Sequence, residues 1–157
     1  MRKEMRRKER QMSEKDALKA LEKAEWGTFC VNGDDGYPYG VPVNYVFKDG
    51  KIIFHSATAG YKFDAVKRDE KVSFTVVTYE KIVPEKFAAD YESIIVFGKA
   101  RFAEDREQKE KGLLELVKVH HSRYMKEGQE YIQKAFNEAC VIEIIPEHIS
   151  GKRCVVL

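Results

Sequence analysis

The sequence lacks any apolar segment long enough to cross a membrane. A transmembrane helix needs about 20 consecutive, mostly apolar residues, whereas 34% of this chain is charged and no apolar run approaches that length. No apolar run follows the basic N-terminus either, as the first part of a signal peptide would require. We therefore expect a soluble cytoplasmic protein with no membrane partner.

Cysteine is scarce, with three widely spaced residues: Cys30, Cys140 and Cys154. The absence of a Cys-x-x-Cys pair excludes the usual arrangements for zinc binding and thiol exchange. Cys30 and Cys140 lie in apolar, strand-like runs and are interpreted as small buried hydrophobic residues. Cys154 has no neighbouring base to activate it. All three are predicted to be structural.

The signatures of several enzyme classes are also missing. The sequence has no Gly-x-Gly-x-x-Gly after a strand, no Gly-Lys-Ser/Thr phosphate loop, no Gly-x-Ser-x-Gly elbow and no His-Glu-x-x-His. His120 and His121 are adjacent on an expected helix, so their side chains point in different directions and do not form a two-histidine metal site. We interpret them as surface or satisfied core histidines, and we predict no metal.

Charge is nearly balanced over the 157 residues, with a formal net charge of +2, so no overall field favours nucleic acid. The N-terminal arm, residues 1–12, is basic: it contains Arg2, Lys3, Arg6, Arg7, Lys8 and Arg10 against Glu4 and Glu9. Such an arm could touch nucleic acid or lipid, but a solvated or dimer-packing tail is favoured because charge blocks are usually hydrated. The length is typical of a single domain over 1–157.

Hydrophobic patterning predicts an α+β fold. Ser13 is expected to cap a helix whose apolar stripe ends at Gly27, and Pro42 to mark an edge or interruption of its strand. Between Glu80 and Tyr91 the periodicity is weak, which suggests a functional loop or a short helix. Strands are expected at 28–31, 39–47, 52–56, 72–77, 94–102 and 141–145, and further helices at 63–68, 106–126 and 129–137. Short meandering strands with separately grouped helices indicate an antiparallel barrel.

One segment, His55 to Lys62, has the composition of a phosphate-binding turn. It joins the end of an expected strand to the start of a helix, where backbone amides favour an anion. Ser56 offers a hydroxyl, Gly60 permits close backbone approach, and Lys62 supplies a positive charge. Arg68 could add a second charge if it lies on the same helical face. An ordinary strand-to-helix turn with Ser/Thr capping explains the same residues equally well.

Four motifs follow one another along the chain: Met-Arg-Arg-Lys-Glu-Arg at 5–10, Gly-Tyr-Pro-Tyr-Gly-Val-Pro-Val-Asn-Tyr at 36–45, Phe-His-Ser-Ala with Gly60 and Lys62 at 54–62, and Tyr-Glu-Ser-Ile-Ile-Val-Phe-Gly-Lys-Ala at 91–100. In this order they resemble the nitroimidazole-resistance (Nim) branch of the pyridoxamine 5′-phosphate oxidase-like flavin-binding proteins. Each motif alone is weak, but their order and spacing cover nearly the whole chain. The resemblance implies an FMN-binding split β-barrel with flanking helices.

The resemblance also implies a cofactor site. In that family FMN binds at a homodimer interface, with its phosphate in the turn and its ring against the first long strand. The cofactor-binding residues implied here are Val41, Pro42, Val43 and Asn44 on the strand, His55, Ser56, Ala57 and Lys62 at the turn, and Tyr91, Glu92 and Ser93 from the other protomer. His55 also matches a histidine proposed to be reactive in some Nim proteins, so it is a catalytic candidate after its phosphate-side or structural role.

The implied function is an FMN-dependent reductase that takes electrons from NAD(P)H or another donor and reduces a small flat acceptor. A nitroaromatic such as a 5-nitroimidazole is the candidate acceptor. The alternative is a binding protein without turnover that carries flavin or haem, and a deazaflavin is also compatible with the family. True pyridoxamine-phosphate oxidases resemble one another in an Arg-Leu-x-Pro ending that this chain, ending at 151–157 in Gly-Lys-Arg-Cys-Val-Val-Leu, lacks. We therefore do not expect it to oxidise pyridoxamine phosphate.

Overall fold

A computed structural model describes residues 3–156 of the chain. The helices are α1 (Glu14–Lys23), α2 (Tyr61–Arg68), α3 (Arg106–His120) and α4 (Met125–Ala135), with 3₁₀ turns at Lys8–Arg10, Pro84–Lys86, Ser122–Tyr124 and Phe136–Glu138. The strands are β1 (Trp26–Asn32), β2 (Pro38–Asn44), β3 (Val46–Lys48), β4 (Lys51–Ala57), β5 (Lys71–Val83), β6 (Ala88–Phe102) and β7 (Ala139–Cys154).

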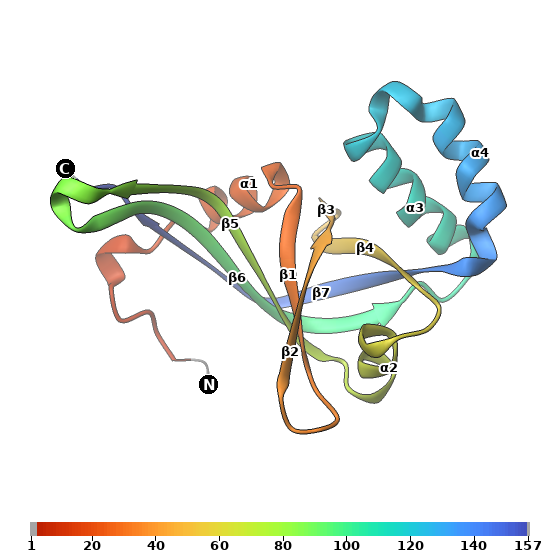
Figure 1. Cartoon of the computed structure of the whole chain (residues 1–157), viewed down its shortest axis with the longest axis horizontal. Helices are drawn as coiled ribbons and strands as arrows, with labels where there is room; N and C mark the ends of the chain where they lie inside the picture. Colours follow the sequence, from red (N-terminus) through yellow and green to blue (C-terminus); the bar gives the residue numbers. More distant parts are fainter. Residues whose placement is uncertain (1–2, 157) are drawn as a thin grey trace.

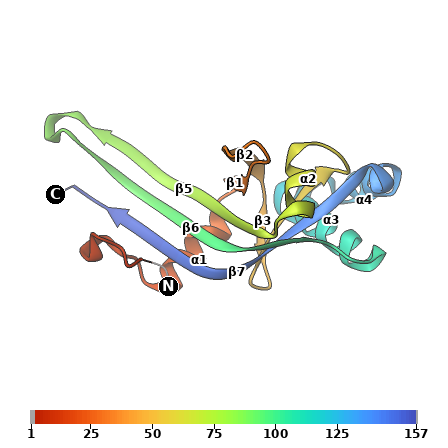
Figure 2. The same ribbon diagram turned by 90° about the horizontal axis from the view of Figure 1, so that it is seen from below.

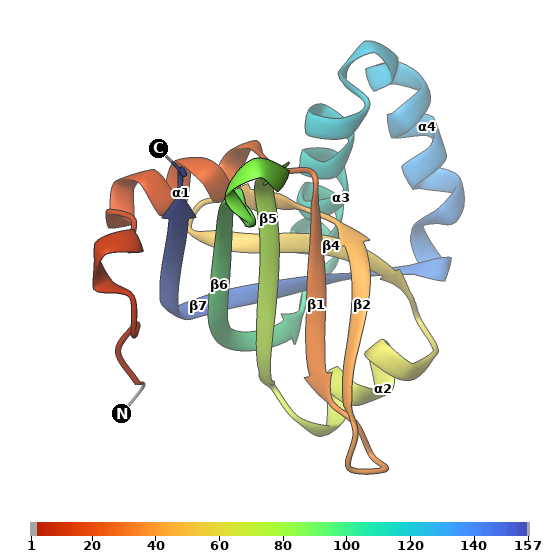
Figure 3. The same ribbon diagram turned by 60° about the vertical axis from the view of Figure 1, so that its left-hand side comes forward.

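The seven strands form one antiparallel sheet in the order β2-β1-β5-β6-β7-β4-β3. β2 and β3 lie at opposite edges of this order, yet Tyr45 alone connects them along the chain. The sheet must therefore curl until its two edges meet, as Figures 1 and 3 show. This confirms the predicted α+β split β-barrel with flanking helices.

Tyr45, the residue at which the edges meet, is fully buried and held from three directions. Its amide donates to Glu25 O over 3.2 Å, its hydroxyl donates to Leu21 O over 2.6 Å, and its carbonyl oxygen lies 2.8 Å from His120 Nε2. Its ring meets Phe74 edge-on at 4.9 Å between centroids. The closure of the barrel is thus fixed by α1, α3 and β5 together.

Two apolar clusters stabilise the molecule. The barrel interior is filled by large, fully buried side chains that include Phe29, Phe54 and Phe74. A second cluster joins the outer face of β3, β4 and β7 to the helical pair α3–α4, and it consists of Val46, Ile53, Leu113, Leu116, Ile132 and Val141. The helical pair stands beside the barrel at one end of the molecule (Figure 1). Gly128 permits its close packing, because a Cβ there would lie 2.5 Å from Val117 Cγ1.

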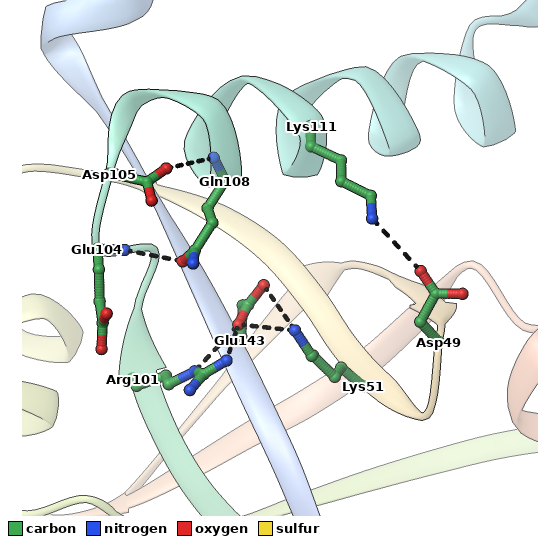
Figure 4. Close-up of polar contacts among 8 residues, drawn as sticks. All are labelled: Asp49, Lys51, Arg101, Glu104, Asp105, Gln108, Lys111 and Glu143. Atoms are coloured by element: carbon green, nitrogen blue, oxygen red, sulfur yellow. Dashed lines mark hydrogen bonds and ion pairs between the residues drawn. The ribbon is translucent and has the colours of Figure 1, made fainter.

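A buried carboxylate and two partly exposed cations link three strands next to that second cluster (Figure 4). Glu143 of β7 is 6% exposed, and its carboxylate accepts hydrogen bonds from Arg101 Nε and Nη2 at 3.1 and 3.0 Å. Lys51 Nζ, on the other neighbouring strand, lies 3.3 and 3.4 Å from the two carboxylate oxygens. The charge of Glu143 is thus balanced by cations from β4 and β6.

Several predicted boundaries are wrong. The strand expected at 39–47 is two strands, because the chain changes its pairing partner from β1 to β4 at Tyr45. The interruption is therefore at Tyr45 and not at Pro42, which lies in an edge strand as predicted. The helix expected at 106–126 ends at His120, and α1 ends at Lys23, well before Gly27, although Ser13 caps it as predicted by accepting from the amide of Asp16.

The segment 80–91 is neither a loop nor a helix. It continues β5 and β6 as a long two-stranded arm, closed by the 3₁₀ turn and by Phe87 in the left-handed region (φ 48°). Figure 2 shows this arm projecting from the barrel. The last strand likewise does not stop before Pro146: β7 continues to Cys154, and its ladder with β6 changes register opposite Gly98. Among residues 3–156, no helix is both long and apolar enough to span a bilayer.

Candidate functional site

The barrel is split where β2 and β4 diverge. The β3–β4 ladder pairs Val46 with Ile53 and goes no further. Beyond that point β4 pairs only with β7, and β2 pairs only with β1. Had the first ladder continued, Asn44 would lie opposite His55. Both strands therefore keep one edge whose backbone N–H and C=O groups are not used by the ladder, and the two edges belong to the segments predicted to bind the cofactor.

A cavity of about 540 Å³ opens at this split. Of the predicted site residues, the structure brings together Asn44 from β2 and His55, Ser56 and Ala57 from β4. The opposite wall is formed by α3, α4 and the turn after α4. Cavities of this size are in the range that holds small molecules and cofactors.

Ser56 has a buried, unpaired hydroxyl. The residue is 4% exposed, and its Oγ has no hydrogen-bond partner among the described residues. A buried polar atom without a partner costs roughly 1–3 kcal/mol, so natural proteins rarely keep one without a reason. A phosphate oxygen of a ligand would accept the missing hydrogen bond. The residues present thus fit a phosphate-bearing cofactor.

His55 and Lys62 add to this turn from either side of Gly60. Gly60 precedes α2 with φ 107°, a conformation that disfavours any side chain, and Lys62 lies in the first turn of α2, where amides point outward. Desolvation by surrounding protein, and secondly the charge of Lys62, lower the pKa of His55 below its usual 6.5, although the side chain is partly open to solvent. Both effects favour the neutral form of His55, and Lys62 is the cation of the turn.

Removing the hydroxyl of Ser56 is expected to raise the stability of the protein and to lower its affinity for FMN. Ser56→Ala removes an unsatisfied polar atom, so we expect the protein without cofactor to gain about 1 kcal/mol in its free energy of unfolding. If the hydroxyl binds a ligand phosphate, the same change should weaken FMN binding about tenfold. Chemical denaturation and fluorimetric titration measure the two effects. A loss of stability together with unchanged affinity would contradict the assignment.

The other predicted strand residues do not line the cavity. Val41 and Val43 are half-buried and pack against the barrel core, so only their backbone is available at the edge of β2, whereas Pro42 faces outward. Arg68 does not join Lys62: its guanidinium donates to the carbonyl oxygen of Asn32 over 2.6 Å. Arg68 was expected to add a second charge only if it lay on the same helical face as Lys62, and this condition is not met.

Tyr91, Glu92 and Ser93 lie on the β5–β6 arm, away from the residues of this cavity. The hydroxyl of Tyr91 accepts a hydrogen bond from Arg10 over 3.2 Å. Glu92 accepts from Thr78 and Arg153, both over 2.6 Å. Their assignment to a second protomer's site stays a prediction, and in this chain the Glu92 carboxylate is already engaged by its own neighbours.

Glu92 makes the stability of the arm dependent on pH. Desolvation raises its pKa, but the hydrogen bonds from Thr78 and Arg153 outweigh it, so the folded-state pKa is below the ordinary value of 4.5. A lowered folded pKa stabilises the fold fully above the unfolded value, and the contribution is lost as pH falls through the folded one. We expect the wild type to be more stable than Glu92→Gln at pH 7 and this advantage to shrink below pH 4.5, as denaturation at several pH values would measure. An advantage that stays constant across this range would contradict the assignment.

Sequence analysis missed the helical side of the cavity. His120 and His121 both line it, together with Tyr131, although they were interpreted as surface or satisfied core histidines. The interpretation itself holds for both residues, because His120 Nε2 is hydrogen-bonded to the carbonyl oxygen of Tyr45 and His121 is exposed at the surface. No local signal could have found them, since the contact joins residues 75 positions apart. Within residues 3–156, no group of three or more His, Cys, Asp or Glu is arranged to hold a metal ion.

The remaining sequence interpretations concern the cysteines and the N-terminal arm. Cys30 and Cys140 are half-buried and not fully buried as predicted, and burial raises the pKa of the Cys140 thiol. The N-terminal arm runs beside β7: Gln11 forms a β-bridge with Lys152, and the amide of Met12 donates to Gly151 O over 2.9 Å. Arg2 of the arm and Leu157 of the C-terminal ending lie outside the described residues.

Comparisons with known proteins identify the family and the fold. The sequence model of a family described as pyridoxamine 5′-phosphate oxidase matches residues 13–153. A search of curated proteins found no match. Among solved structures, a conserved hypothetical protein from Mycobacterium tuberculosis superimposes with a TM-score of 0.81 at 19% identity, over 95% of this chain and 90% of that one.

Two further structures carry functional descriptions. A candidate 5-nitroimidazole antibiotic resistance protein from Bacteroides thetaiotaomicron has a TM-score of 0.72 at 21% identity, covering 91% of this chain and 86% of that one. An FAD-binding protein from Mesorhizobium loti has a TM-score of 0.65 at 18% identity, covering 93% and 98%. At these identities the likeness establishes the shared fold.

Proposed function

Because the chain belongs to the pyridoxamine 5′-phosphate oxidase family, we propose that it binds FMN at the split and reduces a small flat acceptor. A nitroaromatic such as a 5-nitroimidazole is the candidate acceptor, as in the Nim branch that the four sequence motifs resemble. The description of the similar Bacteroides structure supports this branch, and that of the Mesorhizobium structure supports a flavin. Bound FMN would supply the hydride or electron transfer, so no side-chain nucleophile is required.

The observation that carries the proposal is that two features occur side by side. The edges of β2 and β4 at the split have no ladder partner, and the buried hydroxyl of Ser56 on β4 has no hydrogen-bond partner among the described residues. Ser56 and Lys62 hold the phosphate in this proposal, and the neutral His55 donates one ring N–H beside them. The unpaired edge of β2, from Val41 to Asn44, offers backbone donors and acceptors to the polar rim of the ring. Such hydrogen bonds are the protein's main means of setting the flavin potential.

We also propose that the protein works as a homodimer joined through the β5–β6 arm. Large apolar side chains are exposed along this arm, and Phe87 at its tip is completely exposed. The others on the same two strands are Ile82 within the arm and Val77, Tyr79 and Ile95 nearer the barrel, between 40% and 62% exposed. Large apolar side chains exposed along one pair of strands are typical of protein interfaces. A second copy would cover it and bring Tyr91 and Ser93 towards the partner's cofactor.

The first experiment is an absorbance spectrum of the purified protein with mass identification of any released ligand. We expect a two-banded flavin spectrum and FMN, bleaching on anaerobic addition of NADPH or NADH, and reoxidation by 2-methyl-5-nitroimidazole. Bound flavin that no nicotinamide reduces would instead favour the carrier function, and a haem band would replace FMN as the ligand. A protein that neither contains nor accepts FMN would overturn the proposal. Pyridoxamine phosphate serves as the control substrate and should not be oxidised.

A further inference from the structure

The cavity at the split has two chemically different walls. On the β4 side lie His55, Ser56 and Ala57, close to the charge of Lys62. On the helical side the wall is mostly aliphatic, with Leu113, Leu116 and Val117 from α3 and Ile132 and Ala135 from α4. A phosphate suits the first wall and is disfavoured by the second, because burying a charge against aliphatic side chains costs free energy.

The aliphatic wall of the cavity is formed by side chains that also belong to a packed apolar cluster. Leu113, Leu116 and Ile132 line the cavity and are also members of the cluster that joins α3–α4 to β4. α3 and α4 pack closely at Val117 and Gly128, and Val117 also lines the cavity beside this contact. A preformed apolar space of this kind favours an apolar ligand face.

Polar groups on the helical side are few and restrained. His120 Nε2 lies 2.8 Å from the Tyr45 carbonyl oxygen, which can only accept, so Nε2 carries a proton and donates this hydrogen bond. His121 stands at an angle of 66° to the His120 ring, and Tyr131 adds a further ring. Glu138, in the turn after α4, also lines the cavity and would repel an anion on this side.

We propose that this helical wall is the acceptor pocket and that it takes an uncharged, flat heteroaromatic molecule. The proposal rests on the proposed flavin site, whose phosphate occupies the β4 side of the same cavity. The ligand's faces pack against the aliphatic wall and the imidazole and tyrosine rings, and its polar edge meets His120. His120 also ties α3 to Tyr45, so the acceptor pocket and the closure of the barrel share one residue.

Filling the pocket tests this assignment. Ala135 is half-buried at the end of α4 and lines the cavity, so Ala135→Phe would occupy the space beside it. Val119→Phe is the matched control, because it adds the same ring to the exposed side of α3, outside the cavity. The dissociation constants of FMN and of 2-methyl-5-nitroimidazole are measured separately by calorimetry, the latter with and without FMN, and circular dichroism checks the fold.

We expect Ala135→Phe to weaken 2-methyl-5-nitroimidazole about tenfold while FMN affinity changes less than about twofold, and Val119→Phe to change neither. Unchanged nitroimidazole affinity in Ala135→Phe overturns the pocket. So does an equal loss of FMN affinity, because the flavin itself would then occupy the helical wall. A wild type that fails to bind FMN removes the proposed function, and with it the acceptor role of this pocket. A wild type that binds FMN but not the nitroimidazole overturns the pocket alone.

Should Ala135→Phe fail to fold, Tyr131→Leu gives a second test. Tyr131 is 70% exposed, so its replacement costs little stability, but it removes one aromatic ring from the cavity rim. We expect affinity for benzamide to fall more than affinity for cyclohexanecarboxamide, which has the same polar group on a non-planar ring. An equal change for both compounds would contradict selection of flat ligands.

Discussion

Replacing Lys62 with glutamate is expected to lower the affinity for FMN about a hundredfold, equivalent to about 2.7 kcal/mol. The half-buried Lys62 lies in the first turn of α2, and in the proposed site it faces the cofactor phosphate. A charge-assisted hydrogen bond contributes roughly 1.5–3 kcal/mol, and a carboxylate at the same place adds repulsion. Titration of flavin fluorescence with the purified variant measures the effect.

Lys67→Glu is the matched control for this experiment. It makes the same charge change on the same helix, but Lys67 is exposed and its ammonium lies over the Phe63 ring at 5.4 Å. We expect its FMN affinity to stay within a factor of about three, since long-range interactions between exposed charges are screened. Equal losses in both variants would mean that only the net charge matters, and no loss in Lys62→Glu would remove this residue from the phosphate site.

Arg101→Met is expected to destabilise the fold by about 2 kcal/mol. Glu143 would stay buried with Lys51 as its remaining cation, and a buried charge that loses a partner destabilises by up to roughly 3–5 kcal/mol. We expect a smaller loss than this upper range because Lys51 Nζ stays near both carboxylate oxygens and the cations are partly exposed. For a chain of this length we expect a fall in Tm of about 4–8 °C, measured by calorimetry.

Two further variants separate the buried charge from simple loss of contacts. Lys111→Met breaks the exposed ion pair with Asp49, whose charged atoms are 3.7 Å apart (Figure 4), and should cost less than about 0.5 kcal/mol. The double variant Arg101→Met with Glu143→Leu removes the buried charge and should regain most of the stability lost in Arg101→Met. A double variant that is less stable than the single one would show that desolvated charge is not the cause.

The elements that depend on local patterns could be predicted from the sequence. Ser13 has a hydroxyl and acidic residues after it, and it caps α1 as expected. The segment Lys48–Lys51 turns through Asp49 and Gly50, both at positive φ, and joins β3 to β4; Asp-Gly between two apolar runs is a local signal for such a hairpin. The order of strands and helices was then sufficient for the split-barrel class.

Features that depend on distant partners could not be predicted. Alternation continues through Tyr45, because its side chain is buried, but the strand on either side pairs with a different neighbour. Residues 80–91 show weak periodicity because the arm exposes both polar and apolar residues, so burial gives no regular pattern. Pro146 lies inside β7, where a change of register accommodates it.

The same distinction applies to the candidate site. The turn from His55 to Lys62 is contiguous, so its composition alone drew attention to it. The helical wall could not be found in this way, since His120 reaches the cavity only because α3 packs on β4, some 65 residues earlier in the chain. Sequence patterns identified one wall of the cavity, and tertiary packing supplied the other.

The position of β7 in the sheet has a consequence for synthesis on the ribosome. This last strand lies between β6 and β4, so both depend on it for one of their ladders. A nascent chain that ends before Ala139 therefore exposes two open strand edges and leaves the barrel unclosed. Exposed edges invite pairing with other chains. Translational arrest near this point is thus expected to give aggregation or chaperone binding, and release of the final strand to convert the chain to its folded form.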